Sequence, residues 1–177
     1  MNSFLKIVSL VCIASLFSKS EIYCQAKYNT SDSLFIKNLL VHAVNCTKQA
    51  KYDSAIDYAN RALSLSKAVG FKYGVGYAYD HLAEVELLNG KMNLVRQYDS
   101  VVMPLALQLK DTVLMISTFN RAGVYKMEQG KNKEAEQNFL AAINMGLDLQ
   151  ESSKTAEVYS NLGSLYLAMG NKDKASD

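Results

Sequence analysis

The sequence predicts an all-α protein built as a solenoid of helix-turn-helix repeats, and three observations lead to this class. Small residues recur at a spacing of forty positions, at Ala50, Gly90, Gly130 and Gly170. From Ser33 onward, apolar residues follow the three- and four-residue spacings of amphipathic helices. A single Pro and an apolar content of 49% argue against a disordered or turn-rich chain. A period of this length is typical of units that pack on their neighbours along an axis.

The first 26 residues form a segment of their own. A short basic start precedes the apolar run Ile7–Phe17. A membrane span needs about 20 apolar residues, so this run fits the apolar region of a secretory signal peptide instead. We expect cleavage after Ser20 or after Ala26, with residues 27–32 as a linker to the repeats.

Two alternatives to a cleaved signal remain open. One is a lipoprotein, although Val11 and Tyr23 precede the cysteines where a small residue is required. The other is an uncleaved membrane anchor. After cleavage only Cys46 would remain with certainty, so the repeats must be held by packing rather than by disulfides.

The repeats occupy residues 33–177. The predicted units are about 33–70, 71–110, 111–150 and 151–177, the last of them incomplete. The first helices are expected at 33–48, 72–89, 112–129 and 153–169, and their partners at 53–68, 93–109, 133–148 and from 172 onward.

Residues at the helix ends fit these bounds. Gly90, Gly130 and Gly170 can adopt the left-handed conformation that ends a helix. Short polar residues near helix starts can accept hydrogen bonds from unpaired amides; these are Asp32, Asp111, Asn132 and Asn171. Pro104 falls inside a second helix, where it removes a hydrogen bond, so we expect a kink or a restarted helix around residues 100–103.

Further positions share the forty-residue period. The small ones explain how the two helices of a unit approach closely, and the large ones fill the space between units. These sets are Ala43, Ala83, Gly123 and Gly163; Ala55, Val95, Ala135 and Ala175; and Leu39, Tyr79, Phe119 and Tyr159.

The segment LGSLYLAMGNKDKA (162–175) resembles the core of the tetratricopeptide repeat, and AGVYKMEQGKNKEAEQNFLAA (122–142) resembles it nearly as well. The segment LAEVELLNGKMNLV (82–95) is a weaker match, with Glu86 in the Tyr position and Val95 in the Ala position. The resemblance covers roughly residues 36–177 and implies a right-handed superhelix.

One departure from the family is the length of the repeat. The period exceeds the usual length of about 34 residues, as in the extended repeats of some bacterial signalling proteins. The chain also ends within the fourth unit, so we expect it to be the amino-terminal piece of a longer protein.

The resemblance implies a peptide-binding surface on the concave face, which the first helices line. The residues assigned to this surface are Lys37, Tyr77, Asp80, Glu84, Asn120, Arg121, Ser160 and Asn161. Leu40, Val44, Ser117, Val124, Glu157 and Ser164 point to the same side. Leu40, Val44 and Ser117 interrupt the set of residues with which the family clamps chaperone tails, so such tails are not expected as ligands.

Catalysis and metal binding find little support in the sequence. His42 and Cys46 are four residues apart on one helix, but they occupy positions that the repeat buries against its own second helix, so we expect them to fill the core. His81 lies beside the inner face and is interpreted as a surface or groove residue. No enzyme, metal or small-molecule cofactor is predicted. With 19 basic and 17 acidic residues, the chain shows no charge bias towards nucleic acid.

The sequence therefore predicts a non-catalytic scaffold that binds a protein or peptide partner and is exported to the periplasm or the extracellular space. A narrower hypothesis is the sensor part of a membrane signalling protein. Contact with a membrane would then come only through a missing carboxyl-terminal region or an uncleaved signal. The alternative is a structural or assembly scaffold with no dedicated peptide ligand.

Overall fold

The computed structural model describes residues 31–149 and 152–171, and within these ranges it contains seven helices and no strand. The helices are α2 (Ser31–Lys48), α3 (Tyr52–Ala68), α4 (Lys72–Leu88), α5 (Met92–Leu109), α6 (Thr112–Glu128), α7 (Asn132–Leu149) and α8 (Ser152–Ala168). All but α8 have their pairing partner within these ranges. The chain is an all-α solenoid, as the sequence predicts.

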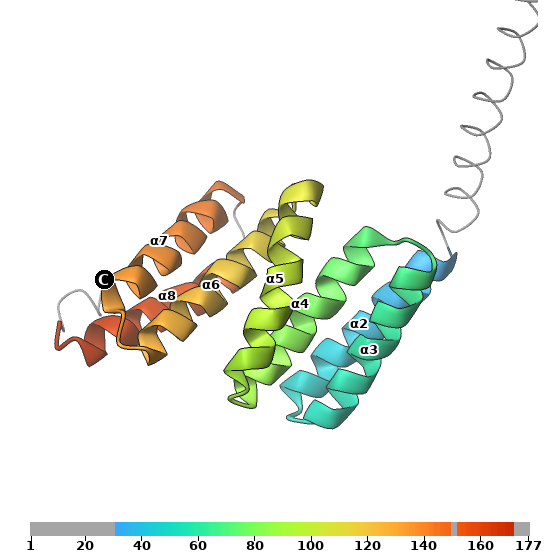
Figure 1. Ribbon diagram of the computed structural model, residues 1–177, viewed down its shortest axis with the longest axis horizontal. Helices are drawn as coiled ribbons and strands as arrows, with labels where there is room; N and C mark the ends of the chain where they lie inside the picture. Colours follow the sequence, from blue (N-terminus) through green and yellow to red (C-terminus); the bar gives the residue numbers. More distant parts are fainter. Residues whose placement is uncertain (1–30, 150–151, 172–177) are drawn as a thin grey trace, which may run out of the picture.

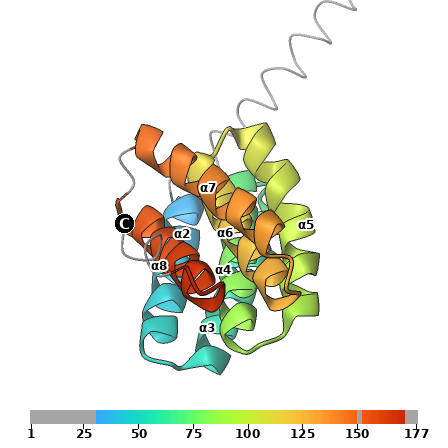
Figure 2. The ribbon, with the colours of Figure 1, turned by 90° about the vertical axis from the view of Figure 1, so that its left-hand side faces the viewer.

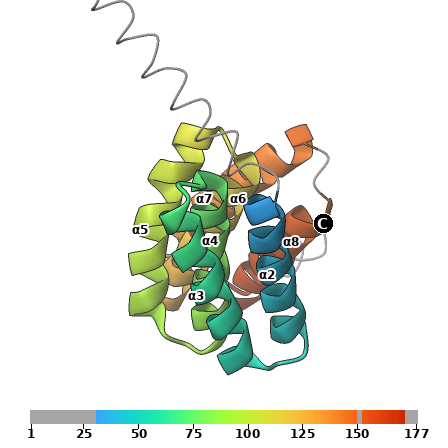
Figure 3. The ribbon, with the colours of Figure 1, turned by 90° about the vertical axis from the view of Figure 1, so that its right-hand side faces the viewer.

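The helices form an elongated array rather than a bundle around one centre. In Figure 1 the array runs from α2 and α3 at the right to α7 and α8 at the left. Figure 2 views the end formed by α7 and α8, and Figure 3 the end formed by α2 and α3. Each helix contacts the next along the chain, and α2, α4, α6 and α8 also contact one another in turn. Among the described residues the second helices make no such contacts, so the first helices line the inner side of the curve.

Left-handed residues end the helices at a spacing of twenty positions. Gly70, Gly90, Gly130 and Gly170 have φ near +70°, while Ala50 and Lys110 have φ of 55° and 54°. The amide after each of them bonds back to the carbonyl five residues earlier, as from Lys91 to Glu86 at 2.8 Å. This pattern satisfies carbonyls that the end of a helix leaves unpaired. It explains why the helices have nearly equal lengths.

The core is spread along the array in separate clusters. One cluster joins α2, α3 and α4 around Ile36 and Leu82, and another joins α6, α7 and α8 around Phe139 and Leu165. Burying one such side chain contributes about 1.5–3 kcal/mol. Because each cluster involves adjacent helices, each unit stabilises mainly the units next to it.

The helix starts agree with the predicted caps only in part. Asp111 caps α6, since its Oδ1 accepts a hydrogen bond from the Leu114 amide at 3.1 Å. Asp32 instead lies within the first turn of α2, and Asn132 is the first residue of α7. Lys51 and Lys91 occupy cap positions without a side-chain cap bond.

Pro104 does not interrupt α5, so the predicted restart of this helix is wrong. The helix is continuous from Met92 to Leu109. Pro104 is exposed, and because proline has no amide hydrogen, the carbonyl of Ser100 loses its helical donor. A bend of the helix axis stays a prediction.

The predicted signal peptide, residues 1–26, lies outside the described residues, as does the helix expected from 172 onward. Of the predicted linker, 27–32, the structure describes only Ser31 and Asp32, and these form the start of α2 instead. Within the described ranges, none of the helices combines the length and apolarity that crossing a bilayer requires.

Candidate functional site

The candidate site is the series of grooves between successive first helices. All the residues assigned to the concave face lie on these helices, which are α2, α4, α6 and α8. Because units repeat every forty residues, equivalent positions of different grooves can be compared directly. The comparison shows that the grooves differ in both volume and chemistry.

The first groove, between α2 and α4, is open and mainly apolar. Its volume is about 610 Å³. It is lined by Lys37, Leu40, Val41, Phe71, Tyr73, Gly74 and Tyr77. Val41 and Tyr73 are 56% and 46% exposed, which leaves large apolar surfaces in contact with water. Lys37 is the one charged residue in this lining.

Gly74 explains how the first groove is built. A Cβ atom at this position would lie 2.3 Å from Ser66 Oγ and 2.6 Å from Phe71 Cδ1. Glycine therefore lets the start of α4 pack closely against α3, and it leaves no side chain in the groove. On the other side, the Tyr77 hydroxyl lies 3.4 Å from Asp111 Oδ1 and donates a hydrogen bond to it.

The third groove, between α6 and α8, is almost completely filled. The remaining cavity has a volume of about 20 Å³. Its lining consists of Glu84, Leu87, Ile116, Ser117, Asn120, Arg121, Lys154, Glu157 and Val158. Five of these stand eighty residues after members of the first groove: Ser117, Asn120, Arg121, Lys154 and Glu157 follow Lys37, Leu40, Val41, Gly74 and Tyr77. The same architectural groove is thus open and apolar at one end of the array, and closed and polar at the other.

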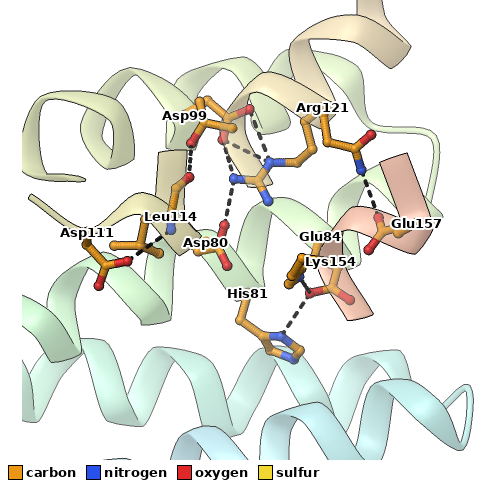
Figure 4. A network of polar contacts seen from close by, with 11 residues as sticks. Asp80, His81, Glu84, Asp99, Asp111, Leu114, Arg121, Lys154 and Glu157 are labelled. Atoms are coloured by element: carbon orange, nitrogen blue, oxygen red, sulfur yellow. Dashed lines mark hydrogen bonds and ion pairs between the residues drawn. The ribbon is translucent and has the colours of Figure 1, made fainter. Parts of the chain in front are cut away.

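Asp80, Asp99 and Arg121 form a buried ionic cluster beside the third groove, whose lining includes Arg121 (Figure 4). Arg121 of α6 is 4% exposed, and its Nη2 lies 2.8 Å from Asp80 Oδ1 and 2.6 Å from Asp99 Oδ1. Its Nε donates to the same Asp99 carboxylate at 2.9 Å. Burial acts to lower the pKa of Arg121, but the carboxylates of Asp80 and Asp99 outweigh it and hold that pKa above its ordinary value. Arg121 therefore stays charged and ties α4, α5 and α6 together.

The amide of Asn120 joins α6 to α8. Its Nδ2 donates to Glu157 Oε1 at 2.9 Å, and its Oδ1 accepts from Asn161 Nδ2 at 2.9 Å. Asn120 is buried, so both ends of its amide are used within the protein. This arrangement fills the third groove with side chains from its own walls.

His81 connects the inner helices on the other side of the cluster. Its Nε2 lies 3.0 Å from Thr47 Oγ1 on α2, and its Nδ1 lies 3.6 Å from Glu84 Oε2. Lys154 Nζ of α8 lies 3.9 Å from the same Glu84 oxygen. The contact with His81 lowers the pKa of Glu84, burial opposes this, and the Lys154 ammonium lowers the pKa further. Glu84 thus remains ionised between two basic side chains.

The residues assigned from sequence therefore divide into two groups. Asp80, Asn120 and Arg121 are buried and bonded within the protein, while Lys37 and Ser160 are exposed. Tyr77, Glu84 and Asn161 are half-buried. The structure brings Lys37 and Tyr77 together in the first groove. The peptide-binding role of the set stays a prediction.

The expectation that His42 fills the core is wrong. His42 is exposed and stacks on Tyr58 of α3, with ring centroids 5.3 Å apart. Its equivalent in the fourth unit, Leu162, is covered by the preceding unit. No described helix precedes α2, so His42 has no such cover. Cys46 is half-buried. Within the described ranges, no three His, Cys, Asp or Glu side chains are grouped in a way that would hold a metal ion.

Sequence reasoning missed the second-helix partner of Arg121 and most of the first groove. Asp99 stands forty residues before Phe139, so the repeat period places a carboxylate at a core position, and this was the available signal. Phe71 and Tyr73 lie around the start of α4, outside the positions that the family's concave face supplies. Val41 stands two repeat periods before Arg121, so the assignment of Arg121 to the site was the signal that could have found Val41.

Comparisons with known proteins agree with this architecture. Residues 114–177 match the family model described as Tetratricopeptide repeat. The chain is also similar to the crystal structure of BtubC (BKLC) from P. vanneervenii, with a TM-score of 0.64 and 19% identity. That match covers 97% of this chain and 71% of the other. At this identity the likeness shows the fold alone. No curated protein matches the sequence.

Proposed function

We propose that this chain is a non-catalytic scaffold that binds a protein partner in the groove between α2 and α4. Tetratricopeptide repeats generally mediate protein–protein interaction, and such a repeat matches residues 114–177. The observation that carries the proposal is the contrast between two equivalent grooves. One retains a volume of about 610 Å³, and the other has closed to about 20 Å³.

The lining of the first groove defines the chemistry of its ligand. Leu40, Val41, Phe71 and Tyr73 provide apolar and aromatic walls, which favour an apolar or aromatic side chain of the partner. Lys37 adds one positive charge to the same lining, which favours a carboxylate beside that side chain. The proposed ligand is an extended peptide segment in which an aromatic or aliphatic residue neighbours an acidic one.

Selecting, from a peptide library, the peptides that bind the full chain tests this function. The matched variant is Leu40→Asn with Val41→Arg, which gives the first groove the residues of the third. We expect selected peptides to carry the apolar–acidic pair, and we expect this variant and Lys37→Glu to weaken their binding at least tenfold. Ser64→Ala, an exposed change on the second helix α3, serves as the control and should leave affinity unchanged. Equal binding by all variants, with helicity intact, would refute the assignment of the groove.

The cellular context belongs to the same proposal. We propose export to the periplasm or extracellular space, supported by the apolar run of residues 7–17, and a role as the amino-terminal sensor part of a membrane signalling protein. Mass spectrometry of the mature protein in its native host should find an amino terminus at Glu21 or Lys27. A mature protein that begins at Met1 or Asn2 contradicts cleavage.

A purely structural scaffold is the second candidate. It is favoured by exposed apolar side chains at both ends of the described array, with Leu34 and Phe35 on α2 and Leu167 on α8. Surfaces of this kind suit end-to-end packing of repeats. If the chain is a structural scaffold, Leu34→Lys should abolish end-to-end assembly, and the variants of the first groove should leave assembly unchanged.

A further inference from the structure

We propose that the closed third groove binds one water molecule, held by Ser117 and shared by three units of the array. This inference does not depend on the ligand of the first groove. Ser117 lies on α6 and is 4% exposed. Its Oγ is fully buried and makes no hydrogen bond within the described part of the protein. A buried hydroxyl without a partner costs about 1–3 kcal/mol, so a bound molecule that satisfies it is favoured.

The size of the cavity selects water. Ser117 lines a cavity of about 20 Å³. A cavity needs about 10–15 Å³ on this measure to hold one water molecule. The space is therefore sufficient for one water and too small for an organic ligand.

The charges around the cavity favour a neutral ligand. Glu84 and Glu157 contribute two carboxylates to its lining, and Arg121 and Lys154 contribute two cations. The cations disfavour a metal ion, and the carboxylates disfavour an anion such as chloride. Water can donate to a carboxylate and accept from an ammonium at the same time.

One distance in the lining supports a bridging molecule. Lys154 Nζ and Glu84 Oε2 are 3.9 Å apart, which exceeds the length of a direct hydrogen bond. A polar contact of this length is commonly completed by water. With partners on α4, α6 and α8, the water would join units two, three and four and would strengthen the long ion pair between Lys154 and Glu84.

High-resolution crystallography of the full chain tests the proposal. We expect one density peak within hydrogen-bonding distance of Ser117 Oγ in the wild type and in the control Ser160→Ala. In Ser117→Val, whose methyl groups occupy the space, the peak should be lost. An empty wild-type cavity, with the hydroxyl turned to the carbonyl of Val113, would overturn the proposal, and so would a peak that persists in Ser117→Val.

Two further measurements keep the test decisive. Soaks with bromide and with rubidium should give no anomalous signal in the cavity. A signal would show that the cavity binds an ion and would contradict the proposal. If Ser117→Val does not fold, nuclear Overhauser contacts between water and Ser117 in the wild type decide the question. Their presence with a long residence time supports the bound water, and their absence contradicts it.

Discussion

Gly123 lies directly against the ring of Phe139. A Cβ atom at position 123 would be 2.4 Å from Phe139 Cε1 and 2.6 Å from Cδ1, and the ring is fully buried. In the first and third units, the side chains at these two equivalent positions differ in size but compensate each other. The first unit pairs Ala43 with Ala59, and the third pairs the smallest residue with the largest. The two helices of a unit can therefore keep a similar separation with different side chains.

Gly123→Ala should destabilise the protein by about 1–3 kcal/mol, because the added methyl overpacks a ring that cannot move away. The measurement is the free energy of unfolding in urea, with helicity as the probe. Combining it with Phe139→Leu is expected to cost less than the sum of the two single changes. Additive costs would show that residue 123 and the ring do not compete for the same space.

Two helix ends offer sites for stabilisation. Ala50 and Lys110 adopt positive φ, although each carries a Cβ atom. The left-handed conformation costs such residues about 1–2 kcal/mol. Glycine removes this cost, but part of the gain is offset because glycine has greater conformational freedom in the unfolded chain. Ala50→Gly and Lys110→Gly should each raise the free energy of unfolding by about 0.5–1 kcal/mol.

The matched control for these changes is Gly90→Ala, made at an equivalent helix end. A Cβ at Gly90 meets no atom within 4 Å, so any loss reports on the backbone alone. We expect a loss of about 1 kcal/mol. If all three substitutions leave thermal stability unchanged, the left-handed conformation at these positions is not the source of strain.

Sequence alone predicted the helices closely because their ends are encoded locally. The glycines at 90, 130 and 170 mark positions that only a left-handed residue can fill, and each proved to have positive φ. Lys110 ends α5 in the same left-handed conformation, but a lysine carries no local signal for it, because glycine and asparagine are the residues that usually adopt it. The core role of His42 failed for a related reason, since burial of that position needs a preceding unit.

The candidate site was predictable in position but not in accessibility. The resemblance to the tetratricopeptide repeat assigned Lys37, Asn120 and Arg121 to the first helices, where they lie. Whether a groove is open depends on side chains from two units and on the second helices. Asp99, on α5, binds Arg121 in the interior. Gly74 leaves the first groove open, whereas its equivalent two units later, Lys154, lines the small cavity of the third groove. Such pairings are set by the tertiary structure.

Arg121 should be essential for stability only while Asp80 and Asp99 carry their charges. Arg121→Met leaves Asp80 and Asp99 buried without a cation, and we expect a loss of about 3–5 kcal/mol in the free energy of unfolding. Adding Asp80→Asn and Asp99→Asn should recover much of this loss, because the uncompensated charges disappear. Arg61→Met, which breaks an exposed ion pair with Asp57, is the control and should cost less than about 1 kcal/mol. A similar cost at both arginines would contradict the role of the buried cluster.

Tyr166 should titrate later than an ordinary tyrosine. Its hydroxyl donates a hydrogen bond to Glu136 Oε1 at 2.7 Å, and this bond, together with burial, raises the pKa of Tyr166 from 10.0 to about 12. The raised value means that folding favours the neutral phenol. The stabilisation is therefore complete below pH 10, where the unfolded chain is also protonated, and it is lost as the pH rises through about 12.

Absorbance titration at the phenolate band measures this shift. Since the chain has 11 tyrosines, the signal of Tyr166 is the difference between the wild type and Tyr166→Phe, and its midpoint should lie near pH 12. Glu136→Gln removes the anion that opposes ionisation, so the midpoint should move down towards 10. The unfolding free energy of Tyr166→Phe should also fall less steeply than that of the wild type between pH 10 and pH 12. A difference signal centred at pH 10 in the folded protein would show that the bond to Glu136 is not made in solution.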